Sequence, residues 1–487
     1  MFDDTIAAIA TPIGEGGLAV VRISGADVLN IADKIFHPIG KKSAKPSAAN
    51  SHTIHFGKIV RSGKAIDEVL LAVLRAPRTF TREDTIEISC HGGILPAKLV
   101  LDTILANGAR LAEPGEFTKR AFLNGRIDLA QAEAVADLIH SRTELALAAA
   151  NEQLAGKLSQ RINQLRDDLM HTLAHVEAHI DFPDEDISPD TKDKLLERLQ
   201  NGISFMDELL RTATEGQILR RGIRAAIIGR PNAGKSSLLN QLLGHDRAIV
   251  SPIAGTTRDT IEETANIRGL PVIFIDTAGL REARDEIEVE GIRRSRQSLA
   301  QAELILHVLD ASEPLTREDE NYFAEFAGKK RIVVRNKMDL AVKLKLNSFS
   351  LPLSGEKAGM RDDSKNELLT PALSLFGEER EKFHIVDVSC ISGQGIELLK
   401  DAIKNLVWSG EIKSEMLQVM INSRHQDALN RARAATQRAF EALSGAATLE
   451  LVALDLRIAV AAVGEIVGKT TTEDLLDSIF SAFCIGK

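Results

Sequence analysis

The chain has 487 residues, of which 44% are hydrophobic and only 4% aromatic, and its formal net charge is -9. This length exceeds what one hydrophobic core serves and suits about three domains. The negative charge argues against broad nucleic-acid binding, although a local basic patch can still bind RNA.

The cysteines and the apolar pattern indicate a reduced, cytoplasmic protein. Cys90, Cys390 and Cys484 lie far apart and form neither a metal-binding spacing nor a disulfide framework. No run of about 20 apolar residues predicts a membrane span. No basic segment followed by an apolar stretch predicts a signal peptide.

The first 118 residues mix short strands with breaks at Gly and Pro, which predicts an N-terminal α+β domain. Residues 38–50, rich in Lys, Ser, Ala and Pro, are expected to form a loop. The expected strands and the expected helix are Thr5–Ala10, Leu18–Ile23, Val69–Leu74, Thr85–Ser89 and, for the helix, Ile94–Ala106.

A helical region follows. Apolar residues recur every three or four positions from Leu154 to Ile180, which predicts one long helix. Pro183 ends it, because proline cannot continue the hydrogen-bond ladder, and a second helix is expected over about 191–214. From about residue 412 the pattern is helical again, and Thr470–Glu473 resembles a capping box before a last amphipathic helix.

Between these helical regions, strands and helices alternate as in a parallel α/β sheet. Residues 341–383 form a polar insertion that is expected to lie on the surface. The expected strands are Ile223–Ile228, Thr260–Ile267, Pro271–Ile275, Leu304–Asp310, Arg331–Arg335 and His384–Val388.

Five motifs follow one another beside these strands. The first, Gly229–Ser236, is a phosphate loop between a strand and a helix, where backbone N–H groups face a β-phosphate. The others are Gly255–Asp259, Asp276–Gly279, Asn336–Asp339 and Ser389–Cys390. One such motif can arise by chance, but five in this order predict binding and hydrolysis of GTP with Mg²⁺.

The phosphate-side residue types suit a magnesium nucleotide. Lys235 would neutralise charge on the β- and γ-phosphates, and Ser236 would ligate Mg²⁺. Asp276 ends an apolar strand and would reach Mg²⁺ through water, while the Gly279 N–H would contact the γ-phosphate. Leu280 stands where Ras-type GTPases have Gln, so hydrolysis needs another polar residue, a cation or both.

The base-side motifs suit guanine. Asn336 and Asp339 would select it, because the carboxylate accepts from the ring N–H and the exocyclic amine, a pattern that adenine lacks. Lys337 would pack its stem along the base. The backbone at Ser389 and Cys390 would place an N–H at the guanine oxygen.

Longer blocks carry a resemblance to a known family. These are the phosphate loop with Asn232, Ala254–Asp259, Leu280, Gly16–Gly25, His91–Gly93, Pro114–Phe117, Ala121–Ala134 and Phe483–Lys487. They resemble the MnmE (TrmE) tRNA modification GTPases, and the similarity extends over residues 5–487.

The resemblance implies a homodimer formed through an N-terminal domain similar to tetrahydrofolate-binding domains. It also implies GTPase domains that associate in a potassium-dependent way. The Asn232 side chain would ligate K⁺ together with the backbone carbonyls of Ser251, Ile253 and Thr256. A cation there would offset charge that develops between the β- and γ-phosphates.

The resemblance further assigns catalytic roles. Thr257 would complete the Mg²⁺ shell, and Glu288 would orient the attacking water, beside Lys235. From the residues alone, Glu288 is equally a surface carboxylate. The predicted GTP-binding set is Asn232, Ala233, Gly234, Lys235, Ser236, Ser237, Ser251, Thr256, Thr257, Asp276, Thr277, Ala278, Gly279, Asn336, Lys337, Asp339, Ser389, Cys390 and Ile391.

The resemblance also implies a site for a tetrahydrofolate derivative, either 5-formyl or 5,10-methylene. Arg22, Glu87, Arg126 and Lys487 would form it. A carboxylate can accept from the pterin ring, and Arg or Lys suits the glutamate tail. Cys484 would be either a reactive thiol beside this site or a small buried thiol.

The implied function is an enzyme subunit. With an FAD-containing MnmG (GidA)-type flavoprotein, in a heterotetramer without membrane contact, it would add an aminomethyl-type group such as carboxymethylaminomethyl to C5 of the wobble uridine of certain tRNAs. The alternatives are a regulatory RNA- or ribosome-binding GTPase of Era or Der type and a folate-dependent methyltransferase with an appended GTPase domain.

The expected fold is therefore an α/β and α multi-domain protein. A Ras-like P-loop GTPase domain with a mostly parallel sheet would be inserted into a discontinuous helical domain. The expected boundaries are 1–118 for the N-terminal folate-binding-like domain, 119–216 and 409–487 for the helical halves, and 217–408 for the GTPase domain.

Overall fold

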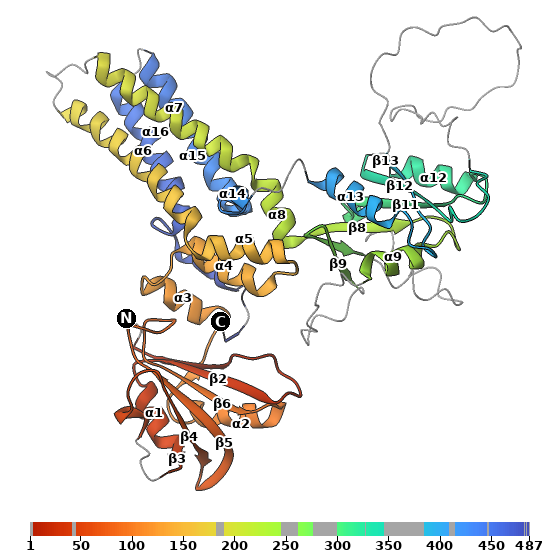
Figure 1. The fold of residues 1–487 in the computed structure, drawn as a ribbon. Helices are drawn as coiled ribbons and strands as arrows, with labels where there is room; N and C mark the ends of the chain where they lie inside the picture. The colour runs from red at the N-terminus through yellow and green to blue at the C-terminus, as the bar shows by residue number, and fades with distance from the viewer. Residues whose placement is uncertain are drawn as a thin grey trace, which may run out of the picture.

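In the computed structural model the chain forms an N-terminal sheet domain, an elongated helical bundle and a second sheet domain (Figure 1). The structure describes residues 3–40, 45–181, 189–244, 262–275, 300–326, 328–344, 384–408, 414–445, 448–481, 483 and 485–486.

The N-terminal sheet has the strand order β3-β4-β5-β6-β2-β1-β7, with neighbours antiparallel except for the parallel pair β1 and β7. Helices α1 (Val28–Ile35) and α2 (Ile94–Leu105) bury aliphatic residues against one face. The strands are β1 Thr5–Ile9, β2 Leu18–Gly25, β3 Phe36–Pro38, β4 Thr53–Arg61, β5 Lys64–Leu74, β6 Thr85–His91 and β7 Arg110–Leu111.

The predicted N-terminal strands and helix are present, but α1, β3, β4 and the two-residue strand β7 were not predicted. In β4 the apolar Ile54 and Phe56 are exposed while Gly57 and Ile59 are buried. Apolar residues on both faces remove the simple alternation that marks a half-buried strand. The predicted loop at 38–50 includes a short 3-10 helix, Pro46–Ala48.

The helical bundle has one hydrophobic core built by α6 (Lys157–Asp181), α7 (Pro189–Arg211), α15 (Ser423–Ser444) and α16 (Leu449–Val467). Because residues on both sides of the second sheet domain share this core, the predicted discontinuous helical domain is confirmed. The shorter helices are α3 Glu116–Leu123, α4 Leu129–His140, α5 Glu144–Leu154, α8 Ala213–Arg221, α14 Ser414–Leu417 and α17 Glu473–Ser481.

Two helix predictions need correction. The stripe beginning at Leu154 spans two helices, because α5 ends there and Gly156, with φ of 83°, separates it from α6. The α17 amide of Leu475 bonds to the Thr472 hydroxyl at 3.4 Å, whereas the Thr470 hydroxyl donates to the Ala461 carbonyl. Thr472 therefore precedes the helix in the capping position, and the box expected from Thr470 to Glu473 does not form.

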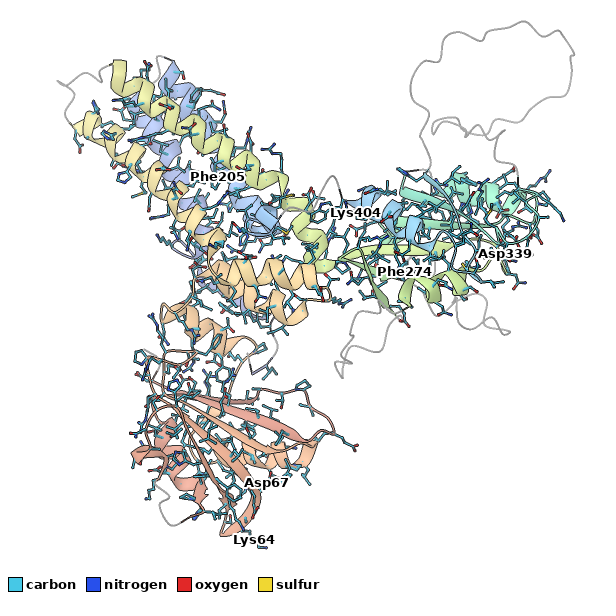
Figure 2. The ribbon with its side chains drawn as sticks, viewed as in Figure 1. Lys64, Asp67, Phe205, Phe274, Asp339 and Lys404 are labelled. Carbon is cyan, nitrogen blue, oxygen red and sulfur yellow. The ribbon has the colours of Figure 1, made fainter. Side chains whose placement is uncertain are left out.

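The second sheet has the order β13-β12-β11-β8-β10-β9 and is parallel except for β9, which confirms the predicted mostly parallel sheet. Phe274 is buried in it, while Asp339 lies beyond the end of β12 (Figure 2). Its elements are β8 Ile223–Ile228, α9 Lys235–Leu243, β9 Glu263–Ile267, β10 Leu270–Phe274, β11 Leu304–Asp310, α12 Arg317–Glu325, β12 Lys330–Asn336, β13 His384–Asp387 and α13 Ile396–Val407.

Two predicted domain boundaries fall inside helices. The boundary at 118 lies in α3, and the one at 216 lies in α8. Within α8, Ala213 belongs to the core of the bundle and Leu219 to the core of the second sheet domain. Helix α8 therefore contributes to the cores of two neighbouring domains, and the three predicted residue boundaries stay predictions.

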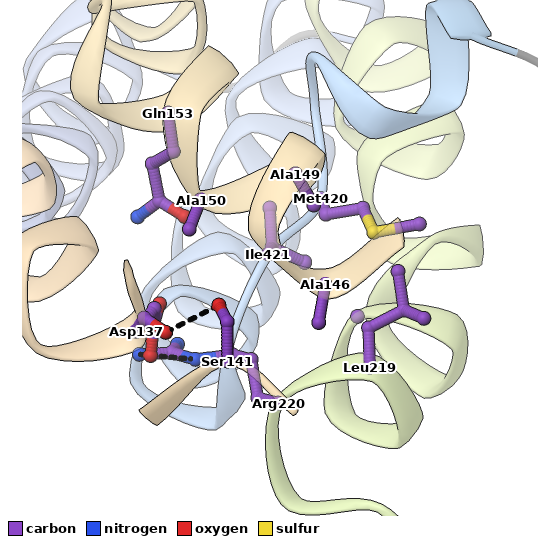
Figure 3. A pocket seen from close by; sticks show the side chains of 11 residues that line it. Asp137, Ser141, Ala146, Ala149, Ala150, Gln153, Leu219, Arg220, Met420 and Ile421 are labelled. Atoms are coloured by element: carbon purple, nitrogen blue, oxygen red, sulfur yellow. Dashed lines mark hydrogen bonds and ion pairs between the residues drawn. The ribbon is translucent and has the colours of Figure 1, made fainter. Parts of the chain in front are cut away.

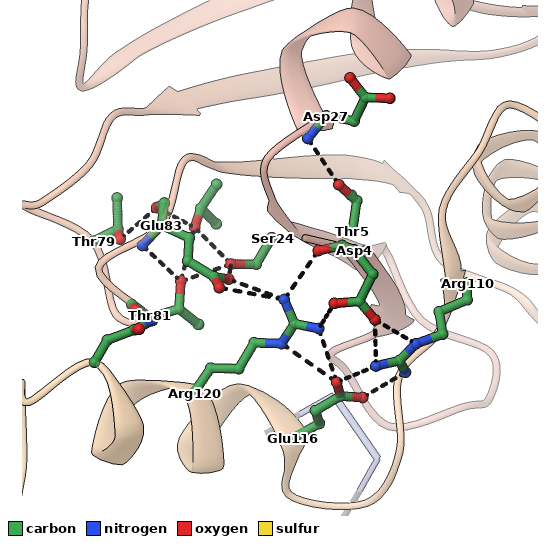
Figure 4. Close-up of polar contacts among 12 residues, drawn as sticks. Asp4, Thr5, Ser24, Asp27, Thr79, Thr81, Glu83, Arg110, Glu116 and Arg120 are labelled. Atoms are coloured by element: carbon green, nitrogen blue, oxygen red, sulfur yellow. Dashed lines mark hydrogen bonds and ion pairs between the residues drawn. The ribbon is translucent and has the colours of Figure 1, made fainter. Parts of the chain in front are cut away.

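A buried ionic cluster joins α3 to the N-terminal sheet (Figure 4). The Arg120 guanidinium is fully buried and lies 2.7 Å from Asp4, 3.0 Å from Glu116 and 3.3 Å from Glu83. Burial opposes ionisation of Glu116, but hydrogen bonds from Arg110 and Arg120 hold its pKa below the ordinary value. The cluster therefore stays charged and fixes α3 against the strand ends.

Candidate functional site

The phosphate loop joins β8 to α9 at the carboxyl edge of the second sheet. Gly229 has φ of 140°, and a Cβ added there would lie 2.2 Å from the Val308 carbonyl oxygen. Gly234 has φ of 98°, and its added Cβ would lie 2.1 Å from Asn336 Nδ2. Both positions therefore require glycine. This strand–loop–helix context favours an anion at the helix N-terminus.

Lys235 lies across this loop. Its ammonium donates to the carbonyl oxygens of Gly229 at 2.7 Å and Arg230 at 2.9 Å. Burial lowers the pKa of Lys235, with the charge of Glu318 opposing the shift. The side chain is thus held where the phosphates of a bound nucleotide would meet its positive charge.

Asn336, at the end of β12, connects the phosphate loop to the loop after β13. Its Nδ2 donates to the Ala233 carbonyl at 2.9 Å, and its Oδ1 accepts from the Cys390 N–H at 3.2 Å. The side chain is 2% exposed. Asn336 therefore aligns the phosphate-binding and base-binding loops through its own amide.

Asp339 and Lys337 are also held by neighbours. The Ser389 hydroxyl donates to Asp339 Oδ1 at 2.6 Å, which orients the carboxylate. The Lys337 ammonium lies 2.6 Å from Asp310 Oδ2 at the end of β11. Asp310 was not predicted, and its only signal in the sequence is a carboxylate at a strand end. Gln241 was also missed, although its Nε2 donates to the Cys390 carbonyl at 2.7 Å.

These residues surround one pocket of about 500 Å³. Burial raises the pKa of the Cys390 thiol to about 11, so this thiol is neutral at physiological pH. The lining residues are Pro231, Asn232, Gly234, Lys235, Ser236, Ser237, Asn336, Lys337, Asp339, Cys390 and Ile391. The structure therefore brings predicted phosphate-side and base-side residues together in one pocket.

The remaining predicted nucleotide-site positions cannot be placed. β10 ends at Phe274, and Ile275 still bonds to the Ala225 carbonyl at 3.0 Å. Outside the described residues lie Ser251, Ile253, Thr256, Thr257, Asp276, Thr277, Ala278, Gly279, Leu280 and Glu288, together with most of the 341–383 insertion.

Two of the predicted folate residues form a pair on the N-terminal sheet. Arg22 in β2 and Glu87 in β6 are direct cross-strand partners, and their charged groups lie 2.9 Å apart. They project from the sheet face opposite α1 and α2, because the alternate residues Val21 and Ile88 are buried against the helices. The pair is partly exposed and can meet a ligand.

Arg126 lies near this region, stacked on the Phe80 ring. Its guanidinium lies 5.1 Å from the Phe80 ring centroid and donates to the Thr79 carbonyl at 2.6 Å. Phe80 packs against the cluster that contains Phe117, and the Arg22 guanidinium lies 5.7 Å from the Phe117 ring. The structure thus places Arg22 and Arg126 beside one apolar cluster, built by Ile6, Ala8, Ala112 and Phe117 with Phe80 packed against it, that sequence reasoning missed.

The C-terminal segment also reaches the Arg22–Glu87 pair. Ile485 forms a β-bridge with Pro114, and the Gly486 carbonyl accepts from Arg22 at 3.4 Å. Gly486 has φ of 93°, and a Cβ added there would lie 2.5 Å from the Ile9 carbonyl oxygen. Cys484 and Lys487 lie outside the described residues.

Two other cavities contain none of the predicted site residues. One, of about 470 Å³, lies between the segment after β1 and the start of α2, and it includes Ile13 and Ile94. The other, of about 20 Å³, lies beside the Asp137–Arg220 ion pair where α4, α5 and α8 meet (Figure 3). It has room for about one water molecule and is too small for an organic ligand.

The described part of the chain contains neither a candidate membrane span nor a cluster of metal-binding side chains. No helix there has the length and apolar character needed to cross a bilayer. Nor do three or more His, Cys, Asp or Glu side chains gather there as a metal-binding group.

Known families match almost the entire chain. The family described as the MnmE helical domain matches residues 129–484, and the family described as the GTP-binding protein TrmE N-terminus matches residues 5–126.

Relatives that align over nearly the whole chain share close to half of its residues. The tRNA modification GTPase MnmE of Geobacillus kaustophilus (strain HTA426) is 46% identical over 487 residues, which cover 99% of each chain. That of Geobacillus thermodenitrificans (strain NG80-2) is 47% identical over 488 residues, again 99% of each chain. That of Thermoanaerobacter pseudethanolicus is 44% identical over 489 residues and covers both chains fully.

Proposed function

The chain belongs to the MnmE family of tRNA modification GTPases, and from this premise we propose that it hydrolyses GTP in a reaction that modifies tRNA. The observation that carries the proposal is the single pocket in which the phosphate loop meets Asp339. Ser389 holds that carboxylate in place through a 2.6 Å hydrogen bond. A carboxylate so placed can accept two N–H groups from guanine but not from adenine.

On the phosphate side, Lys235 neutralises charge on the β- and γ-phosphates, and the loop amides at Gly234 hold the β-phosphate. Ser236 supplies a hydroxyl ligand for Mg²⁺, which when bound offsets charge on the phosphate oxygens. Thr257 and Glu288, as a second Mg²⁺ ligand and as the residue that orients water, complete the proposed machinery.

Potassium dependence is part of the proposal. Asn232 lines the pocket with an exposed side chain and has φ of 61°, so its amide is available to a cation beside the phosphates. We expect Asn232→Ala to abolish stimulation of GTP hydrolysis by K⁺ while GTP affinity changes little. Hydrolysis rates measured in potassium and in sodium test this, and equal stimulation of variant and wild type would contradict the assignment.

The proposed reaction adds an aminomethyl-type group to C5 of the wobble uridine, together with an FAD-containing MnmG-type partner. Arg22, Glu87, Arg126 and Lys487 would hold the tetrahydrofolate derivative that supplies the carbon, in a homodimer formed through the N-terminal domain. GTP hydrolysis would move the GTPase domains rather than perform the carbon chemistry.

The experiment that tests this function is mass spectrometry of tRNA nucleosides from a deletion strain. We expect aminomethyl-type wobble uridines to disappear and to return when the wild-type chain is supplied, but not when Lys235→Ala is supplied. Unchanged wobble uridines in the deletion strain would overturn the proposal.

A regulatory GTPase of Era or Der type would not need a folate site. Calorimetric titration of the full chain with 5-formyltetrahydrofolate therefore separates the two functions. We expect binding in the micromolar range or tighter, and no heat of binding at these concentrations would favour the regulatory function.

A further inference from the structure

Two loops at the edge of the N-terminal domain expose three arginines, Arg78, Arg82 and Arg126. The first two lie in the segment between β5 and β6, and Arg126 lies between α3 and α4. The loops are joined directly, because the Arg82 guanidinium donates to the Asn124 carbonyl at 3.0 Å and Arg126 donates to the Thr79 carbonyl at 2.6 Å. Arg82 and Arg126 thus each bond to the loop that carries the other, and Arg78 directly precedes Thr79, the residue that Arg126 contacts, so the three arginines are treated together as one group.

The charge of this group is not neutralised by neighbouring carboxylates. Arg82 and Arg126 bond to uncharged carbonyls, and a guanidinium has five N–H donors, so several remain free. Arg78 makes no hydrogen bond or ion pair with any other described residue. The nearest acidic residues in sequence are occupied: Glu83 is buried against Arg120, as Figure 4 shows, and Asp84 accepts from the Ala76 amide and pairs with another arginine.

Several exposed arginines of the helical bundle differ from this group in their pairing. On the helical bundle each of several surface arginines lies within 2.7 Å of a carboxylate oxygen, so their charges are paired. The pairs are Arg431 with Glu465, Arg433 with Asp207, Arg438 with Asp455 and Arg457 with Glu177. The unpaired charges of the Arg78–Arg82–Arg126 group therefore favour an anionic ligand.

The position of the arginine group indicates which kind of anion it would bind. Arg126 stacks on Phe80, which packs against the apolar cluster that contains Phe117, and the Arg22 guanidinium of the Arg22–Glu87 pair lies beside the Phe117 ring. A folate whose pterin meets Glu87 would direct its benzoyl-glutamate end across these rings toward Arg126. Any further γ-linked glutamates would then continue toward Arg82 and Arg78.

We infer that the Arg78–Arg82–Arg126 group binds the oligo-γ-glutamate tail of a polyglutamylated folate, so that the protein prefers such folates over the monoglutamate form. The inference rests on the folate site of the proposed function and specifies its substrate class. Each added glutamate contributes one carboxylate, and an exposed ion pair of this kind should tighten binding about two- to fivefold.

The test is calorimetry of the full chain with 5-formyltetrahydrofolate that carries either one or three glutamates. For the wild type at low salt we expect the triglutamate to bind about tenfold more tightly. This ratio should shrink toward one in about 0.5 M salt, because ions screen exposed pairs. The measured quantity is the ratio of the two affinities, which a general loss of folding does not mimic.

Arg78→Ala should reduce the ratio to about threefold, and Arg78→Glu should bring it close to one or below. Arg78 is exposed and unbonded, so both variants should fold. Arg61→Ala, at another exposed arginine of the same domain, is the matched control and should leave the ratio at the wild-type value.

Equal affinities of the wild type for both ligands, or a ratio that Arg78→Glu leaves unchanged, would overturn this inference while the folate site itself stands. Absence of binding by either ligand would instead remove the folate part of the proposed function, and the inference with it. If Arg78→Glu weakens binding of unmodified tRNA but not of the triglutamate, the group is an RNA contact and the inference is wrong.

Discussion

The nucleotide pocket takes its residues from the ends of adjacent parallel strands, whereas the candidate folate site joins segments from both ends of the chain. In the pocket, the phosphate loop follows β8, Asn336 is the last residue of β12, and Cys390 lies in the loop after β13. In the folate region, Arg22 of β2 and the Gly486 carbonyl are brought together across nearly the entire sequence. The nucleotide pocket therefore depends on the second sheet alone. The candidate folate site depends on how α3 and the C-terminal segment pack against the N-terminal sheet.

The largest expected effect that separates the two regions comes from Arg120→Met. The substitution leaves the buried carboxylates of Glu83 and Glu116 without their shared cation, so the N-terminal domain should lose about 3–5 kcal/mol of stability. GTP affinity should stay near that of the wild type, because the pocket belongs to another sheet. Denaturant unfolding and nucleotide titration of the same preparations measure the two effects.

Arg110→Met is the matched control for that experiment. Arg110 bonds to Asp4 and Glu116 as well, but its side chain is 45% exposed, so water can replace much of what is lost. A destabilisation as large as that of Arg120→Met would show that burial is not what makes the cluster important.

A smaller effect is expected inside the pocket from Asn336→Ala. The change removes the bonds to the Ala233 carbonyl and the Cys390 amide, and leaves two buried groups unsatisfied. Two such groups together cost about 2–6 kcal/mol, but much of this cost also falls on the nucleotide-free protein, so GTP affinity should fall only roughly 10- to 100-fold. Folate affinity should be unaffected, and titration of both ligands checks whether the regions are energetically separate.

The smallest expected effect is a pH dependence confined to the nucleotide domain. Burial, aided by the charge of Arg331, lowers the pKa of His307 in β11 to about 4. Between that value and the unfolded pKa near 6.5, only the unfolded chain binds the proton, so stability falls as the pH is lowered. From pH 7 to pH 5 the loss from this group should be about 2 kcal/mol.

His307→Gln should remove this contribution and flatten the pH profile of the corresponding unfolding transition. The transition of the N-terminal domain should keep its wild-type pH dependence, since His307 lies in the other sheet. An unchanged profile in the variant would show that His307 does not control the acid sensitivity of the nucleotide domain.

The same contrast explains how much the sequence could predict. The phosphate loop and the Asn336–Asp339 motif were predictable, because each places its chemistry within a few residues of a strand end. Asp310 was missed, although it bonds to Lys337, because nothing in the local sequence pairs the two. The aromatic support of the folate region by Phe80 and Phe117 was missed for the same reason, since it arises only when distant segments pack.

The central claim is that the residues at the end of β12 select guanine. The most direct test is to measure the nucleotide preference of the Asp339→Asn variant. Hydrogen bonds to charged groups contribute about 1.5–3 kcal/mol each, so kcat/KM for GTP should fall about 100-fold. XTP should become the preferred substrate, because xanthine has a carbonyl in place of the exocyclic amine and can accept from the new amide. Retention of the wild-type preference for GTP would contradict the account.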